Sequence, residues 1–200
     1  MRNAGAYFAG GVCFFALTFL TACASFKHQD QDTASASNAP STNLCENGYA
    51  LLYDLLGDEK DVSKLLIIKR ERPELKTLIK EISQKSGEDH KHIGEFGKTN
   101  SQVNLKAKAL PPAELETRKA ISKAKTKELL TEKGKDFELQ LLLSQNEALV
   151  YGTHLAGTTA KSESDPTRAQ FLQQLSGELG QLRQKVLTML MEHYSWSPPK

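Results

Sequence analysis

The side chains of this protein that could bind a metal ion or transfer a proton are those of its histidine, aspartate and glutamate residues. They are densest in the stretch Glu88-Asp89-His90-Lys91-His92. A carboxylate-bridged di-metal centre in a helical bundle requires two Glu-x-x-His motifs, because both ligands of a motif must leave one helix face. No glutamate of the sequence has a histidine three residues later, and Asp89-x-x-His92 is the nearest relative of the motif. The sequence also contains no phosphate-binding loop, so we expect no enzyme.

Several polar residues fall on otherwise apolar helix faces. They are Asp89 and His90 on one helix, and Asn146, Glu147 and His154 on another, with Asn146 and His154 predicted to face inward and Glu147 to lie at the edge. One interpretation is that they are hydrogen-bonded interior groups that fix the register of the helices. The other is a mononuclear metal or small-ligand site between helices. We expect the first and no cofactor, because histidine ligands need converging partners.

The spacing of apolar residues predicts the helices that position these side chains. From Cys45 onward, apolar residues recur every three or four positions. We expect helices over about residues 47–70, with an irregularity at Gly57, and over residues 73–97, 136–156 and 165–194. Residues 98–112 are expected to be the long connection, and after Pro111-Pro112 a polar, lysine-rich helix is expected to lead through a break at Gly134 into the helix at residues 136–156. The helix at residues 136–156 is apolar on two faces and should be the most buried.

The ends and the apolar seam of the last helix can also be predicted. Asp165 suits an N-cap, and Pro166 and Pro73 suit first helical positions. The seam of the last helix is predicted to consist of Leu172, Leu175, Leu179, Leu182, Val186 and Met189. The pattern predicts an all-α fold, an antiparallel four-helix bundle with one long crossover between its second and third helices.

The chain begins with one positive charge at Arg2, followed by an uncharged, mostly apolar run that ends in Leu20-Thr21-Ala22-Cys23. The run is long enough for a retained transmembrane helix, which is the alternative interpretation. The string Leu20-Thr21-Ala22-Cys23 resembles the lipobox of bacterial lipoproteins. This resemblance implies that residues 1–22 are a signal peptide and that Cys23 carries a diacylglycerol, with a further acyl chain such as palmitate on its amino group in Gram-negative bacteria. Ala24 in place of Asp favours the periplasmic side of the outer membrane over the inner membrane.

Residues 23–43 hold the lipidated cysteine and a polar tether, which we expect to be disordered because it cannot bury a core. Residues 44–197 hold the helical domain. The chain has 26 basic and 24 acidic residues, so we expect no nucleic-acid partner. Cys45 is the thiol left in the domain, and it can be a buried small hydrophobe, an intermolecular bridge or a reactive group.

The body carries three stretches that match a known pattern, "EKDVSKLLIIKRERPELKTLIKEISQKSGEDHKHI", "LPPAEL" and "FELQLLLSQ". Together they resemble the ferritin-like family of exported bacterial domains of unknown function. The resemblance implies a ferritin-like fold and places the acidic residue of the family at Glu59, its Asp-His at Asp89-His90 and its Phe-Asp at Phe137-Glu138. Leu149 stands where the family has a histidine. The chain therefore lacks one of the ligands that a metal site shared with the family would need.

The sequence therefore predicts a lipid-anchored envelope protein that acts as a binding or structural module on the periplasmic face. Its partners are the membrane, through the lipid, and in addition a possible protein of the envelope. The alternative is a ferritin-like metal-binding or redox protein with a degenerate site, for which the candidate ligands are Glu59, Asp89, His90, Glu147 and His154.

Overall fold

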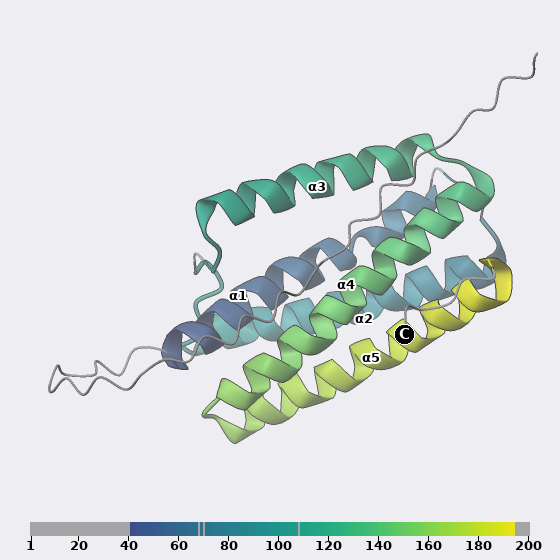
Figure 1. The fold of residues 1–200 in the computed structure, drawn as a ribbon. Coiled ribbons are helices and arrows are strands. Elements are labelled where there is room, and N and C mark those ends of the chain that lie inside the picture. Colours follow the sequence, from purple (N-terminus) through teal and green to yellow (C-terminus); the bar gives the residue numbers. More distant parts are fainter. Residues whose placement is uncertain (1–40, 68, 70, 108, 195–200) are drawn as a thin grey trace, which may run out of the picture. The chain divides into compact units, whose positions relative to one another are not determined.

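The computed structural model describes residues 41–67, 69, 71–107 and 109–194 of the chain. They form the helices α1 (Ser41–Glu59), η1 (Val62–Ile67, a 3-10 helix), α2 (Pro73–Thr99), α3 (Pro112–Thr131), α4 (Gly134–Ser162) and α5 (Pro166–Tyr194), shown in Figure 1. The described residues include no strand, so the prediction of an all-α protein is confirmed. The lipobox with Cys23 and residues 24–40 of the predicted tether lie outside this part of the chain, whereas residues 41–43, also predicted as tether, belong to α1.

Helices α1, α2, α4 and α5 pack side by side, and successive pairs run in opposite directions (Figure 1). His90 of α2 stacks on Tyr53 of α1, with ring centroids 4.0 Å apart. In the second pair, the Ser176 hydroxyl of α5 donates a hydrogen bond to the Thr153 carbonyl of α4 at 2.8 Å. None of the described helices has both the length and the apolar character that a membrane span requires.

The core lies between these four helices and follows the predicted apolar faces. Leu52, Ile79, Leu141 and Leu175 are each at most 1% exposed. Helix α4 contributes more buried residues than any other helix, as its two apolar faces predict. The predicted seam of α5 is buried from Leu172 to Val186. After Val186, however, the next buried residue of the seam is Leu190 and not Met189 as predicted, because a residue four positions further along a helix lies on nearly the same face.

The predicted helix starts are confirmed. Pro73 and Pro166 are the first residues of α2 and α5, where a missing N–H costs no helical hydrogen bond. The Asp165 carboxylate accepts a hydrogen bond from the Arg168 N–H at 2.9 Å, which satisfies one of the free amides of the first turn.

The first predicted helix, residues 47–70 with an irregularity at Gly57, is interrupted, because α1 ends at Glu59, two residues after that glycine. The Lys60 carbonyl accepts a hydrogen bond from the Ser83 hydroxyl of α2. Beyond it, the Asp61 and Lys64 amides bond to carbonyls three residues earlier, at 3.2 and 3.0 Å. The chain therefore tightens into the 3-10 geometry of η1 beside α2.

Two glycines let α4 approach its neighbours closely. A Cβ atom at Gly48 of α1 would overlap the side chain of Thr159, and one at Gly152 would lie 2.9 Å from methyl groups of Leu55 and Leu179. Such distances are below van der Waals contact, so a larger residue at either position would require these side chains to move, the β-branched Thr159 less easily than the flexible ends of the two leucines.

Helix α3 belongs to the connection between α2 and α4 and runs antiparallel to α4 (Figure 1). Of its residues, all of them described, Leu129 alone is buried. Polar contacts hold α3 in place. Arg118 donates to the Tyr151 hydroxyl at 3.2 Å, Lys125 pairs with Glu147, and the Lys69 ammonium donates to the Leu130 and Glu132 carbonyls at 2.9 and 2.6 Å.

Candidate functional site

The five candidate metal ligands lie in different parts of the helical body. Asp89 is buried between α2 and α5, His90 is half-buried beside α1, Glu59 is half-buried below α3, and Glu147 and His154 are exposed on α4. Among the described residues, no group of three or more His, Cys, Asp or Glu side chains is placed to hold a metal ion.

The prediction that His154 faces inward is wrong. His154 follows buried Leu149 by five residues, and at about 100° per residue this turns it to the far side of the helix. Glu147, predicted at the edge, is exposed and pairs with Lys125. Asn146 is half-buried, and its carbonyl oxygen accepts a hydrogen bond from Arg183 at 3.1 Å. The polar residues of α4 that do face inward are Glu138, Gln145 and Thr159.

Asp89 is a buried carboxylate with a cationic partner on one of its oxygens, whereas its Oδ2 atom has no hydrogen-bond partner. Its carboxylate lies 3.4 Å from the Lys85 ammonium, which also pairs with Glu178 at 2.6 Å. Burial raises the pKa of Asp89, and the Lys85 charge opposes this shift. The Asp89 carboxylate therefore links α2 to α5 through Lys85.

Glu138 occupies the position of the aspartate in the Phe-Asp pair of the ferritin-like pattern. It also belongs to an ion pair, with Arg72. Its carboxylate accepts hydrogen bonds from the Arg72 side chain at 2.9 Å and from the Tyr194 hydroxyl at 2.8 Å. Although burial opposes it, these bonds lower the pKa of Glu138. The contact ties the start of α2 to the start of α4 and the end of α5.

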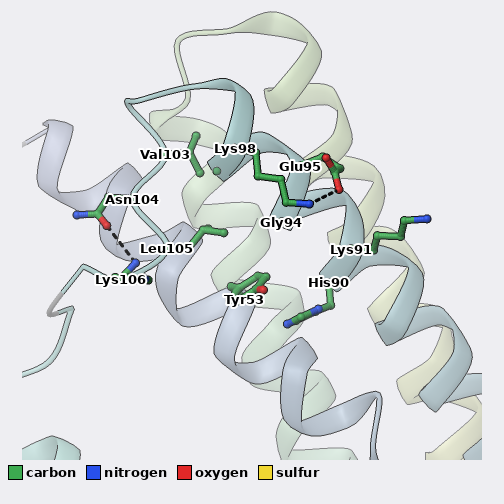
Figure 2. A pocket seen from close by; sticks show the side chains of 11 residues that line it. Tyr53, His90, Lys91, Gly94, Glu95, Lys98, Val103, Asn104, Leu105 and Lys106 are labelled. Carbon is green, nitrogen blue, oxygen red and sulfur yellow. Dashed lines mark hydrogen bonds and ion pairs between the residues drawn. The ribbon is translucent and has the colours of Figure 1, made fainter.

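His90 lies in a surface pocket of about 520 Å³ between α1, α2 and the loop after α2 (Figure 2). Tyr53 and Leu105 form its apolar side, and the Lys98–Glu95 ion pair, at 2.8 Å, lies at its rim. Burial, together with the nearby Lys60 charge, lowers the pKa of His90. A Cβ atom at Gly57 would stand 3.3 Å from the His90 Nε2 atom, so Gly57 provides the space for the stacked ring.

A second and larger cavity, which we name the α3 cleft, lies between α1, η1, α3 and α4. Its volume is about 640 Å³, within the range of small-molecule sites. Its apolar walls comprise Leu55, Val62, Leu65, Ile121, Leu129 and Ala148. Its polar groups include Glu59 from α1 and Gln145 from α4. The cleft therefore combines an apolar surface with polar and charged side chains from α1, the following turn, α3 and α4.

Glu59 and Gln145 each present a hydrogen-bond acceptor that no protein group satisfies. The Glu59 Oε2 and Gln145 Oε1 atoms are buried and lack a partner. Gln145 is only 2% exposed. Burial raises the pKa of Glu59 to about 7, against the lowering effect of a hydrogen bond from the Gln145 side chain to the Glu59 carboxylate, and the Asp58 charge adds to the rise. A buried acceptor left without a donor costs about 1–3 kcal/mol, so the pair is a costly feature of the fold.

The cationic residues of the α3 cleft are engaged elsewhere. Arg118 donates to the Glu114 carboxylate at 2.7 Å and to the Tyr151 hydroxyl, and Lys125 pairs with Glu147. Asp58 also lines the cleft, and its pKa is raised by burial and by the neighbouring Asp54 and Asp61 charges. Each cation of the cleft thus has a carboxylate partner, and the acidic residues Asp58, Glu59 and Asp61 add negative charge to the lining.

Sequence reasoning missed Gln145, although the sequence contained a signal for it. Gln145 stands four residues from both Leu141 and Leu149, which are buried, so it occupies the same stripe of α4. The roles of Arg118 and Lys125 carried no such signal, because they depend on where α3 lies.

Another polar cluster connects α1 to the turn between α4 and α5. The Glu163 carboxylate accepts hydrogen bonds from the Tyr49 hydroxyl at 2.7 Å and from Arg168 at 2.9 and 3.0 Å. Burial opposes ionisation, but these bonds and one from the Asp165 amide lower the pKa of Glu163 to about 2. The Cys45 thiol lies 3.6 Å from the same carboxylate, and burial, together with that charge, raises its pKa to about 11. Cys45 is thus poorly suited to act as a thiolate.

The fold and the site define an all-helical protein with a ligand-sized cleft at one side of its helical bundle. Comparison with models of protein families, with curated proteins and with solved structures finds no match to the chain.

Proposed function

We propose that the protein is a lipid-anchored module of the bacterial envelope, held by Cys23 at the periplasmic side of the outer membrane, and that its helical domain acts by binding. The Leu20-Thr21-Ala22-Cys23 string and the apolar run before it support the anchor. Two or three acyl chains, at about 0.8 kcal/mol per buried CH₂, would make attachment to the membrane stable.

We further propose that the domain is an antiparallel four-helix bundle of ferritin-like connectivity. In this description α1, α2, α4 and α5 form the bundle and α3 belongs to the crossover. The antiparallel pairs and the long connection that contains α3 support it.

The observation that carries the binding role is the α3 cleft with its two unpartnered acceptors, Glu59 Oε2 and Gln145 Oε1. Buried polar atoms of proteins are normally hydrogen-bonded, and exceptions call for an explanation. The residues do not fit a ferritin-like metal centre. Asp89 pairs with Lys85, and the other candidates lie apart from it in the described structure.

The anchor is tested by metabolic labelling with palmitate in a Gram-negative host. We expect labelled protein in the outer-membrane fraction. The Cys23→Ser variant should lose the label and accumulate as a larger precursor that retains residues 1–22.

Cys45→Ser is the matched control, because it removes the cysteine of the domain and leaves the lipobox intact. It should be labelled like the natural protein. Full labelling of Cys23→Ser, or loss of labelling in Cys45→Ser, would contradict the assignment of Cys23 as the anchor.

A further inference from the structure

We propose that the α3 cleft binds a small organic amine, with the ammonium group held by Glu59 and Gln145 and the hydrocarbon part against the apolar walls. This inference deepens the binding role proposed above and rests on it. It names a class of ligand, a compact aliphatic amine.

Two buried oxygen atoms of residues that line the cleft decide the charge of the ligand. Glu59 Oε2 and Gln145 Oε1 are both acceptors, so the complementary group must be a donor. An ammonium group has three donors and no acceptor, so one group can serve both oxygens. A carboxylate ligand would add a third acceptor beside Glu59 and Asp58 and would be repelled.

The cations that line the cleft do not cancel this preference. Arg118 is bound to Glu114, and Lys125 is bound to Glu147, so each already has an anionic partner. Glu59 has a neighbour of like charge in Asp58, and Asp61, also in the cleft, pairs with Lys64 at 2.7 Å. Besides Glu59, the charged residues that line the cleft are Asp58, Asp61, Arg118, Lys125 and Glu147.

The walls of the cleft decide the rest of the ligand. Leu55 and Val62 come from the α1 side, Ile121 and Leu129 from α3, and Ala148 from α4. Burying a CH₂ group against such surfaces contributes about 0.8 kcal/mol, so a chain of several carbons gains affinity over ammonia or methylamine. The volume of about 640 Å³ accommodates an amine of that size.

The test is isothermal titration calorimetry of the full-length protein in a mild non-ionic detergent, with protein-free micelles as the blank. The probes are hexylamine, 1-hexanol and hexanoate, which share a hydrocarbon chain and differ in charge. We expect hexylamine to bind, and hexanol and hexanoate to bind at least tenfold more weakly. Glu59→Gln should weaken hexylamine binding at least tenfold, since it replaces a charge-assisted hydrogen bond by a neutral one.

The pH dependence provides a second signature. Protons compete with the amine for Glu59, so hexylamine affinity should be about 30-fold lower at pH 5.5 than at pH 8.5, given a Glu59 pKa of about 7. Hexylamine itself stays protonated over this range. Glu59→Gln should show no such dependence, and exposed Glu192→Gln on α5 should behave like the natural protein.

Thermal melts followed by circular dichroism separate lost binding from lost folding. Glu59→Gln should melt at or above the temperature of the natural protein at pH 8.5. Absence of hexylamine binding, equal binding of hexanol, or unchanged affinity in folded Glu59→Gln would overturn the proposal. The palmitate experiment tests Cys23 and involves no amine. The proposal of a lipid anchor and the proposal of an amine ligand can therefore be refuted independently of each other.

Discussion

The buried carboxyl of Glu59 predicts a specific effect of pH on stability, and Glu59→Gln isolates it. Burial raises the Glu59 pKa from 4.5 to about 7. Each unit of difference between the folded and unfolded states corresponds to about 1.4 kcal/mol, so ionised Glu59 costs the folded state about 3 kcal/mol.

The sign of the effect follows from which state binds the proton more tightly. Below about pH 4.5 the carboxyl is protonated in both states and no cost arises. As the pH rises, the unfolded chain ionises first, so stability falls from pH 4.5 onward and reaches its lower value above about pH 7. Glutamine has a similar shape and no charge, so Glu59→Gln should not lose stability in this way.

The assay is urea unfolding of a soluble chain comprising residues 38–200, followed by circular dichroism at pH 5, 7 and 9. This range matches the compact unit of the structure. Glu59→Gln should be more stable than the natural sequence by about 1 kcal/mol at pH 5 and about 3 kcal/mol at pH 9. Other titrating groups are common to both proteins, so the difference reports Glu59 together with its repulsion by Asp58.

The exposed residue Glu192 supplies the control, since Glu192→Gln should follow the natural sequence at every pH. A difference between Glu59→Gln and the natural sequence that stays constant from pH 5 to pH 9 would refute the reasoning. So would a loss of stability in Glu59→Gln at pH 9, because it would mean that the ionised carboxylate has a favourable partner.

Three further predictions concern other parts of the domain. The Glu163 pKa of about 2 implies about 3 kcal/mol of stability that is lost as the pH falls from 4.5 to 2, and Glu163→Gln, less stable at pH 7, should lack this acid-dependent loss in thermal melts. Leu179→Asp should cost about 3–5 kcal/mol in urea unfolding, since Leu179 is 2% exposed and the new charge would lack a partner, and an unchanged midpoint would contradict the seam of α5. Iodoacetamide should alkylate Cys45 at pH 8 about 100-fold more slowly in the folded protein than in urea, because its pKa rises from 9.0 to about 11, and equal rates by mass spectrometry would exclude this.

The regular part of the fold was predictable because local sequence determines it. The spacing of leucines in α5 gave its buried face, and Asp165 and Pro166 gave its first turn, since these signals act within a few residues. The irregularity predicted at Gly57 lies two residues before the end of α1, but the tertiary contact at this end was not predictable from local sequence. It depends on Ser83, a residue of α2 that binds the Lys60 carbonyl from more than twenty positions away.

The candidate site was predictable only in part, because a side chain on α4 changes face with a shift of one residue. Gln145 and Asn146 are neighbours about 100° apart, and the first is buried with an unsatisfied oxygen whereas the second bonds to Arg183. Choosing His154 as inward-facing was the same kind of error. Glu59 was singled out from a resemblance to a family, whereas its burial depends on helices that are distant in sequence.

The α3 cleft arises from the connection between α2 and α4. Helix α2 spans 27 residues, about 40 Å, and the chain must return that distance before α4 can run antiparallel to α1. Helix α3 provides about 30 Å of the return with 20 residues. Because Leu129 is the single buried residue of α3, this helix does not fill the space beside Glu59 and Gln145 as a core helix would. Polar contacts of Lys69, Arg118 and Lys125 attach α3 to the other helices instead. The wall of the cleft that α3 forms therefore depends largely on polar contacts, whereas the part of the cleft formed by α1 and α4 belongs to helices that pack in the core.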